Sequence, residues 1–151
     1  MQLAATRRLD GVDGIALALF QRISVLNQRL FTRIRGGVSR TEAGALKTLA
    51  IRPRRITELA AIEGITQPAA TQIVNRLAAR GWAERERDPN DARAVVVRLA
   101  DAGREALERL RAEVRAALHE ELGGLDDDDV ETLAAAVVIL GRVVAGLGET
   151  E

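Results

Sequence analysis

The chain has 151 residues, of which 47% are hydrophobic and 29% charged, and it contains no cysteine. The missing cysteine excludes disulfides, zinc–thiolate sites and thiol-based redox sensing. Basic and acidic residues balance, but they are segregated: residues 1–51 hold eight and three, residues 52–99 nine and six, and residues 100–151 five and thirteen. The length predicts one domain, or one domain with an appended interaction segment. The charge gradient suits a basic working face on one side and an acidic helical part on the other.

The beginning of the chain, MQLAATRRLDG, lacks the apolar stretch of a signal peptide, and no run of 18 apolar residues follows. We therefore expect a cytoplasmic protein with no membrane partner. Two phenylalanines and one tryptophan are the only aromatic residues, so the core must be aliphatic. The abundance of Ala, Leu, Arg and Glu favours helix.

The first predicted helix covers residues 10–35, with Asp10 or Asp13 as its cap and Gly36 and Gly37 at its end. Apolar residues recur along it at three- and four-residue steps: Ile15, Leu19, Ile23, Leu26, Leu30 and Ile34. Thr41 is the predicted cap of a second helix, which must stop before Pro53.

A short helix capped by Thr57 should end at Gly64, and Thr66 should cap the next helix almost at once. That next helix is predicted over residues 66–80, with Pro68 in its first turn. Its inward stripe should consist of Ala70, Ile73, Val74, Leu77 and Ala78. Two helices joined by a tight glycine turn are the elements of a helix-turn-helix.

A hairpin is predicted next, with arms over residues 83–87 and 93–99 and a tip over residues 88–91. Two long helices follow, one from Asp101 to about Leu122 and one that starts at the four aspartates 126–129, where negative charge suits the helix dipole. The predicted fold is mainly α with a small β-hairpin: a winged helix-turn-helix at residues 41–99, flanked by dimerisation helices at 10–35 and 101–147. These terminal helices have more apolar face than so small a domain can cover, so we expect them to pair with a second copy.

The outward face of helix 66–80 has the chemistry that base edges in a major groove require. No acidic residue lies between Glu63 and Glu84. Amides can pair with adenine, arginine can pair with guanine or a phosphate, and the hydroxyl and nearby backbone N–H groups of Thr66 can bind a phosphate. The alternative is a solvated polar face. The outward residues are Gln67, Thr71, Gln72, Asn75, Arg76 and Arg80.

The hairpin carries arginines along both arms: Arg85, Arg87, Arg93 and Arg98. An arginine near a wing tip can enter a minor groove, whose negative potential deepens where the groove narrows. We favour Arg93 for this role, with Asp91 orienting it, and give the triplet Asp91-Ala92-Arg93 more weight than the alternating charges before the tip. The alternative, which is compatible with it, is that the hairpin's four acids pair with these arginines on a wet surface.

Enzymatic patterns are missing from the sequence. His119 is the only histidine, and it lacks the second histidine of a zinc pair, so a surface or interface position is expected. Ser24 and Ser39 are the only serines, and no phosphate-binding glycine loop occurs. The aspartate run 126–129 could bind a cation, but a helix start explains it equally well. We expect neither an enzyme nor a bound metal or cofactor.

Two motifs resemble the MarR (multiple-antibiotic-resistance regulator) family. The family's wing signature is Asp-x-Arg, three residues, Val-x-Leu-Thr, two residues and Gly, and here Asp91-Ala92-Arg93 is followed by Val97-Arg98-Leu99-Ala100 and Gly103. The segment from Ile56-Thr57-Glu58-Leu59-Ala60 through Gly64-Ile65-Thr66-Gln67-Pro68 to Asn75-Arg76-Leu77 is similar to the family's helix-turn-helix. The order of elements agrees along nearly the whole chain.

The resemblance implies a homodimer that straddles a palindromic site in double-stranded DNA and represses transcription. It also implies release by a small anionic or phenolic ligand, bound between the dimer helices and the DNA-binding lobe. The residues expected to contact DNA are Thr66, Gln67, Thr71, Gln72, Asn75, Arg76, Arg87, Asn90, Asp91 and Arg93.

Some positions depart from the family's pattern. Ala100 replaces the usual Thr, so Asp101 is expected to cap the following helix, and Glu63 stands where an apolar residue is usual. Ala69 and Gln72 stand where many relatives carry Thr and Arg, and Asn75 stands where Asp is frequent. These changes affect the operator sequence and not the DNA-binding role. A rival hypothesis is a winged helix that has lost DNA binding and serves as a protein-interaction module. The first predicted helix carries Arg22, Arg29 and Arg33, which could attract an anionic effector. This indication is weak, since a solvated face or salt bridges in a dimer explain these arginines as well.

Overall fold

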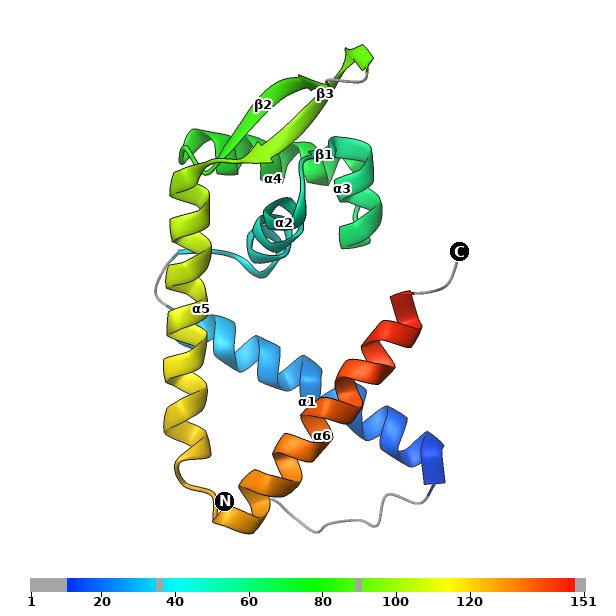
Figure 1. Ribbon diagram of the computed structural model, residues 1–151, viewed down its shortest axis with the longest axis vertical. Helices are drawn as coiled ribbons and strands as arrows, with labels where there is room; N and C mark the ends of the chain where they lie inside the picture. The colour runs from blue at the N-terminus through cyan, green and yellow to red at the C-terminus, as the bar shows by residue number, and fades with distance from the viewer. Residues whose placement is uncertain (1–10, 35–36, 89–90, 149–151) are drawn as a thin grey trace. The chain divides into compact units, whose positions relative to one another are not determined.

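The computed structural model describes residues 11–34, 37–88 and 91–148 (Figure 1). It has two compact units, residues 1–114 and residues 115–151. In chain order the elements are α1 Gly11–Arg33, α2 Arg40–Ile51, β1 Arg54–Arg55, α3 Ile56–Glu63, α4 Gln67–Ala79, β2 Ala83–Asp88, β3 Asp91–Leu99, α5 Asp101–Leu122 and α6 Asp127–Gly148. The predicted mainly helical fold with a small hairpin is confirmed. The strand β1, which makes the sheet three-stranded, was not predicted.

Two predicted helix caps are wrong, each by two residues. Ser39, and not Thr41, caps α2: its Oγ accepts a hydrogen bond from Glu42 N (3.2 Å), and its own N donates to Glu42 Oε2 (2.9 Å). This reciprocal pair satisfies two backbone N–H groups at once, which a cap at Thr41 would not do. Arg55, and not Thr57, is the cap residue of α3, which begins at Ile56: Arg55 N donates to Glu58 Oε2 at 2.8 Å.

The turn and the second helix of the helix-turn-helix agree with the sequence. Gly64 ends α3 in the left-handed conformation (φ 63°), where a side chain would be strained. Thr66 caps α4, its Oγ1 accepting from Ala69 N at 3.4 Å. Ala70, Ile73, Val74 and Leu77 are buried as predicted, but Ala78 is exposed because it lies one helical step off the stripe.

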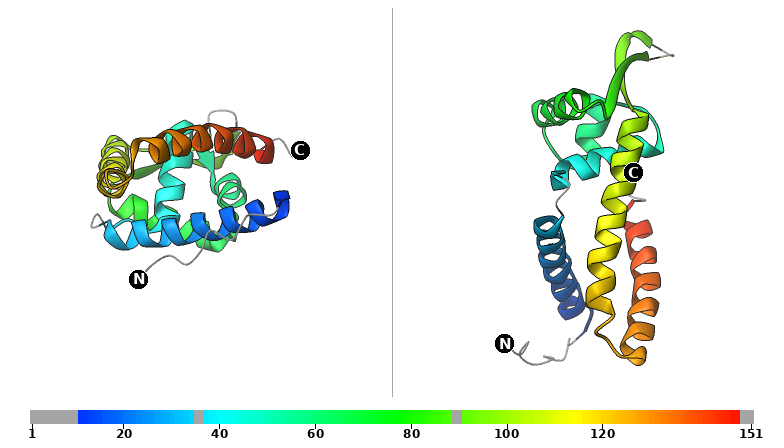
Figure 2. Two further views of the ribbon diagram at one scale, coloured as in Figure 1. Left: turned by 90° about the horizontal axis from the view of Figure 1, so that it is seen from below. Right: turned by 90° about the vertical axis from the view of Figure 1, so that its left-hand side faces the viewer.

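The sheet has the order β1-β3-β2, with both pairings antiparallel. Arg85 pairs with Val97, and Glu86 pairs with Val96. Because side chains alternate along a strand, Ala83, Val97 and Leu99 enter the core from one face of the sheet. The β2–β3 hairpin projects beyond the helices beside it (Figure 2).

The segment from Arg40 to Leu99, here called the lobe, closes around an aliphatic core that α5 completes with Leu107 and Leu110. Gly103 lets α5 lie against the sheet, since a Cβ there would overlap the backbone carbonyl of Trp82. The unusual Glu63 has local partners. Thr48 Oγ1 donates to Glu63 Oε1 at 2.6 Å, and Gly44 leaves the space that the carboxylate fills.

The apolar residues of α1 and α6 stay largely exposed. On α1, Ile15 is 50% and Leu26 48% exposed, although Phe31 and Ile34 pack against the core. On α6, Val137 is 58% and Val144 64% exposed. The predicted start of α6 is confirmed by Asp126 Oδ1, which accepts from Asp129 N at 2.8 Å. By length and composition, Asp127–Leu147 is the single described helix that could also cross a membrane, a criterion that the core helices of soluble proteins meet too.

Candidate nucleic-acid interface

The outward face of α4 presents polar side chains to solvent, as its sequence predicts. Gln67, Gln72 and Asn75 are exposed. Thr71 is half-buried, and its Oγ1 donates to Gln67 O at 3.0 Å, so its hydroxyl hydrogen is already engaged. Thr66 stands exposed at the helix N-terminus, where backbone N–H groups favour an anion.

Arg76 lies on the same face but also connects α4 to α2. Its Nε donates to Glu42 Oε1 at 3.0 Å; the Glu42 side chain is 4% exposed, and that of Arg76 is 50% exposed. Burial raises the pKa of the Glu42 carboxyl, but hydrogen bonds from Ser39 and Arg76 outweigh it and hold the pKa below its ordinary value. The exposed part of Arg76 is therefore held in place by a buried carboxylate.

Arg80 was predicted to lie on the outward face of α4. Its contacts instead join the end of α4 to the segment between α1 and α2. Its Nη2 donates to Gly37 O at 3.0 Å, and its guanidinium lies 4.7 Å from the centre of the Trp82 ring. The hydrogen bond holds the segment before α2 against the end of α4, and the ring contact keeps the guanidinium in place over Trp82.

The alternating charges of β2 separate onto the two faces of the sheet. Arg85 and Arg87 share a face with Ala83, which packs in the core beside α4. Glu84 and Glu86 lie on the other face, where Arg98 bonds both; its Nε donates to Glu86 Oε1 at 2.6 Å. The expected surface pairing is thus found for Arg98. The alternating charges before the tip received little weight in the sequence-based prediction. In the structure, this alternation places Arg85 and Arg87 on the side of the wing that faces α4.

Arg55 joins the two strands of the wing near its tip, a contact that was not predicted from the sequence. Its Nη2 donates to Asp88 Oδ2 at 2.7 Å and lies 3.6 Å from Asp91 Oδ2. The hydrogen bonds to Asp88 raise the pKa of Arg55 above its ordinary value. Arg55 is 33 residues from Asp88, and only the pairing of β1 with β3 brings them together, so no local signal indicates this contact.

The remaining predicted wing residues are described only in part. Asn90 and the side chain of Arg93 lie outside the described residues. The orientation of Arg93 by Asp91 therefore stays a prediction. Arg87 is exposed on β2.

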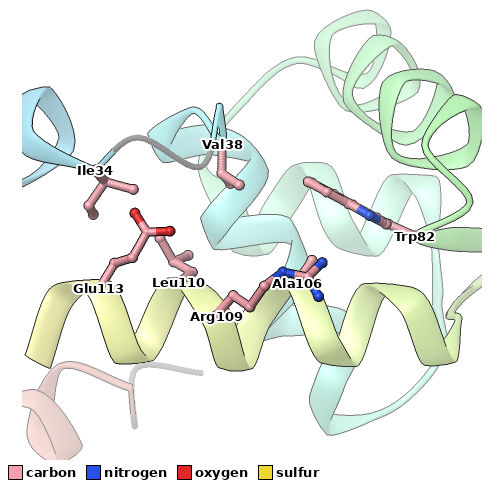
Figure 3. Close-up of a pocket in the computed structure, with 7 residues that line it drawn as sticks. All are labelled: Ile34, Val38, Trp82, Ala106, Arg109, Leu110 and Glu113. Carbon is pink, nitrogen blue, oxygen red and sulfur yellow. The ribbon is translucent and has the colours of Figure 1, made fainter.

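A cavity of about 90 Å³, open to solvent, lies beside α5 (Figure 3). Ile34, Val38 and Trp82 line it opposite α5, from which Leu110 and the charged Arg109 and Glu113 project. Trp82 is the ring over which Arg80 lies, so the cavity wall directly adjoins the end of α4. In the described part of the chain, no three acidic or histidine side chains gather to hold a metal ion.

Comparison with known proteins connects these features to one family. A family model described as MarR family matches residues 36–94. The chain is 38% identical over 77 residues to the multiple antibiotic resistance protein MarR of Escherichia coli (strain K12), an alignment over 50% of this chain and 54% of that protein. It thus spans about half the length of the curated relatives it matches.

Solved structures extend the likeness along the chain. The apo form of wild-type MarR from E. coli gives a TM-score of 0.68 at 26% identity, over 81% of this chain and 96% of that one. A probable transcriptional regulator from Pseudomonas aeruginosa is 30% identical, with a TM-score of 0.59, over 87% and 97% of the two chains. NadR, in complex with 4-hydroxyphenylacetate, shares the fold over the full length of both chains (TM-score 0.69, 20% identity). With the matching helix-turn-helix and wing, the chain belongs to the MarR family and has its winged-helix fold.

Proposed function

We propose that this protein is a homodimeric, cytoplasmic transcriptional repressor that binds a palindromic operator through α4 and the wing. The observation that carries the proposal is the division of charge in the lobe. The outward face of α4 holds amides, hydroxyls and Arg76, and the wing turns Arg85 and Arg87 to the same side. Glu84 and Glu86 lie on the opposite face, where Arg98 neutralises them.

The dimer is supported by the exposed apolar faces of α1 and α6. Large side chains exposed along whole helices are rare on soluble monomers and favour a protein partner. A second copy with the same helices would cover them through a symmetric interface, and a two-fold dimer requires a two-fold operator. Sedimentation equilibrium of variants with charges on the apolar face of α6 tests this dimer.

DNA binding can be tested by footprinting on the DNA upstream of the protein's own gene, followed by titration of the protected duplex. We expect Arg93→Ala to weaken binding strongly while the dimer stays folded, because it removes the predicted minor-groove contact. Arg98→Ala is the matched control: it removes the same charge from the same strand, but on the face turned away from α4. Absence of protection would contradict DNA binding and favour the protein-interaction module.

We propose further that a small anionic or phenolic effector releases the DNA, and that it binds in the cavity beside α5. The cavity combines apolar residues with Arg109, whose charge suits a carboxylate although Glu105 lies 3.6 Å from it and Glu113 also lines the cavity. NadR was solved with an aromatic carboxylate of this kind. Trp82 is the single tryptophan of the chain, so its fluorescence reports directly on the cavity.

The effector proposal is tested by titrating 4-hydroxyphenylacetate and related aromatic acids while recording Trp82 fluorescence. A saturable change that Arg109→Ala abolishes and Arg104→Ala retains would support the site, since Arg104 lies on α5 outside the cavity lining. An equal response in both variants would remove Arg109 from the site. Footprints repeated with the same acids show whether binding releases DNA.

A further inference from the structure

Arg85 and Asn75 meet at the exposed junction of the wing and α4. Arg85 Nη2 donates a hydrogen bond to Asn75 Oδ1 at 2.6 Å. Arg85 is the third residue of β2, and Asn75 lies in the second half of α4. Both side chains are exposed, so the contact adds little to the core. Its main consequence is the orientation that it gives to the Asn75 amide.

The chemistry of the pair fixes which amide atom faces Arg85. A guanidinium group has donors only, so the amide atom that it contacts must be the acceptor, Oδ1. Nδ2 is then left to present N–H groups to a ligand. Reading adenine with both amide atoms needs the oxygen for the adenine N6 amino group and the nitrogen for N7. An oxygen that is already bonded to Arg85 is poorly placed for this.

Guanine suits an amide in this state better than adenine does. Its major-groove edge offers two acceptors, N7 and O6, and no donor. At adenine, the N6 amino group would face a second N–H group. Resting on the proposed DNA-binding function, we propose that Arg85 is a positioning residue that holds Asn75 as a donor, so that Asn75 selects guanine over adenine at the base pair it contacts.

The test uses the full-length protein and a pool of DNA duplexes randomised over the length of one operator, with selection and sequencing at one fixed salt concentration. The wild type should enrich guanine at one position in each half-site. Arg85→Ala frees Oδ1, so the ratio of guanine to adenine there should shift toward adenine by roughly five- to a hundredfold, the range of one bidentate contact. Asn75→Ala should lose discrimination at the same position.

Arg87→Ala is the matched control, because Arg87 lies on the same strand face and carries the same charge. It should weaken binding to all sequences about equally and leave the preferred base unchanged. If Arg85→Ala behaves in the same way, Arg85 acts through charge alone and the inference is overturned. Equal circular-dichroism melting curves for the variants confirm that the lobe stays folded.

A second measurement replaces the Asn75 donor group by an acceptor. In Asn75→Asp, Arg85 would hold one carboxylate oxygen and leave the other as an acceptor, so we expect enrichment of cytosine, whose N4 amino group donates. Retained guanine preference in this variant would contradict the assignment. A wild type that binds duplex DNA but prefers adenine there overturns this inference alone. A wild type that binds no duplex overturns the proposed function as well.

Discussion

The lobe and the helix α6 use apolar residues in opposite ways. In the lobe, Leu46, Leu59 and Leu77 are completely buried, and even the charged Glu42 is covered. On α6, Val137 and Val144 are more than half exposed. The lobe therefore contains its own core, whereas the apolar side of α6 is left uncovered. We expect a second protein surface to cover it. Substitutions in the two regions should accordingly change different quantities: folding stability in the lobe and association in α6.

The largest effect is expected at the centre of the lobe. Leu77→Ala removes a fully buried side chain between α4 and the sheet and should lower the free energy of unfolding by about 2–5 kcal/mol, measured by urea denaturation. Ile51→Ala removes a branched aliphatic side chain from the same lobe, but one that is 77% exposed. It should stay within about 0.5 kcal/mol of wild type. Equal losses would show that burial in the lobe is misassigned.

Charge on the apolar face of α6 should act on association. The double variant Val137→Asp/Val144→Asp would place two carboxylates in the proposed interface, so the dimer dissociation constant should rise roughly a hundredfold or more. Sedimentation equilibrium without detergent measures it.

Arg142→Asp changes the net charge by the same amount, but on another side of the same helix. It should leave most of the dimer intact. A wild type that sediments as a monomer, or a double variant that dimerises like the wild type, would contradict the proposed use of α6.

Replacing a glycine by alanine adds one methyl group, and it should have different effects in the lobe's packing and on α6. Gly103→Ala drives a Cβ into the carbonyl of Trp82, a backbone atom that cannot turn aside, and should cost about 1–3 kcal/mol of stability. At Gly141 on α6 a Cβ would meet no described atom within 4 Å, so Gly141→Ala should stabilise the isolated helix slightly, by its propensity. Thermal denaturation of both variants measures the difference. A destabilising Gly141→Ala would instead indicate a close partner surface at that residue.

The buried carboxylate of the lobe should make stability depend on pH. The folded pKa of Glu42 lies below its ordinary value of 4.5, so its contribution is complete above that pH and is lost as the pH falls through the folded pKa. Glu42→Gln should cost about 1–2 kcal/mol at neutral pH, and the difference from wild type should shrink below about pH 4.5. A difference that stays constant down to pH 3 would show that the charge of Glu42 is not what stabilises the α2–α4 contact.

Local signals were enough to predict most elements of the fold. Apolar periodicity and the glycine at position 64 located α3 and α4, and Thr66 was recognised as a cap. The errors occur where an element depends on a competing local contact or on pairing with a distant segment of the chain. The capping box of Ser39 competes with a nearby Thr41, and the two-residue strand β1 exists only through its pairing with β3.

The candidate site was also only partly predictable from local sequence signals. The polar face of α4 can be predicted from spacing alone. The partners of Arg76, Arg85 and Arg55 cannot, because each pair joins different elements of the fold, over 10 to 34 residues of sequence. The two faces of β2 follow from strand alternation once the register with β3 is known. Sequence spacing thus identified residues that could contact DNA, and tertiary pairing decides which atoms they present.

The most direct test of DNA binding through α4 and the wing is the salt dependence of affinity for the protected duplex, measured by fluorescence anisotropy. Each neutralised phosphate releases counterions, so log affinity should fall linearly with log salt, with a slope of about −0.9 per phosphate contacted. We predict a steep negative slope for the wild type that becomes shallower by about one contact per subunit in Arg87→Ala. A flat response, with the dimer intact, would contradict the account.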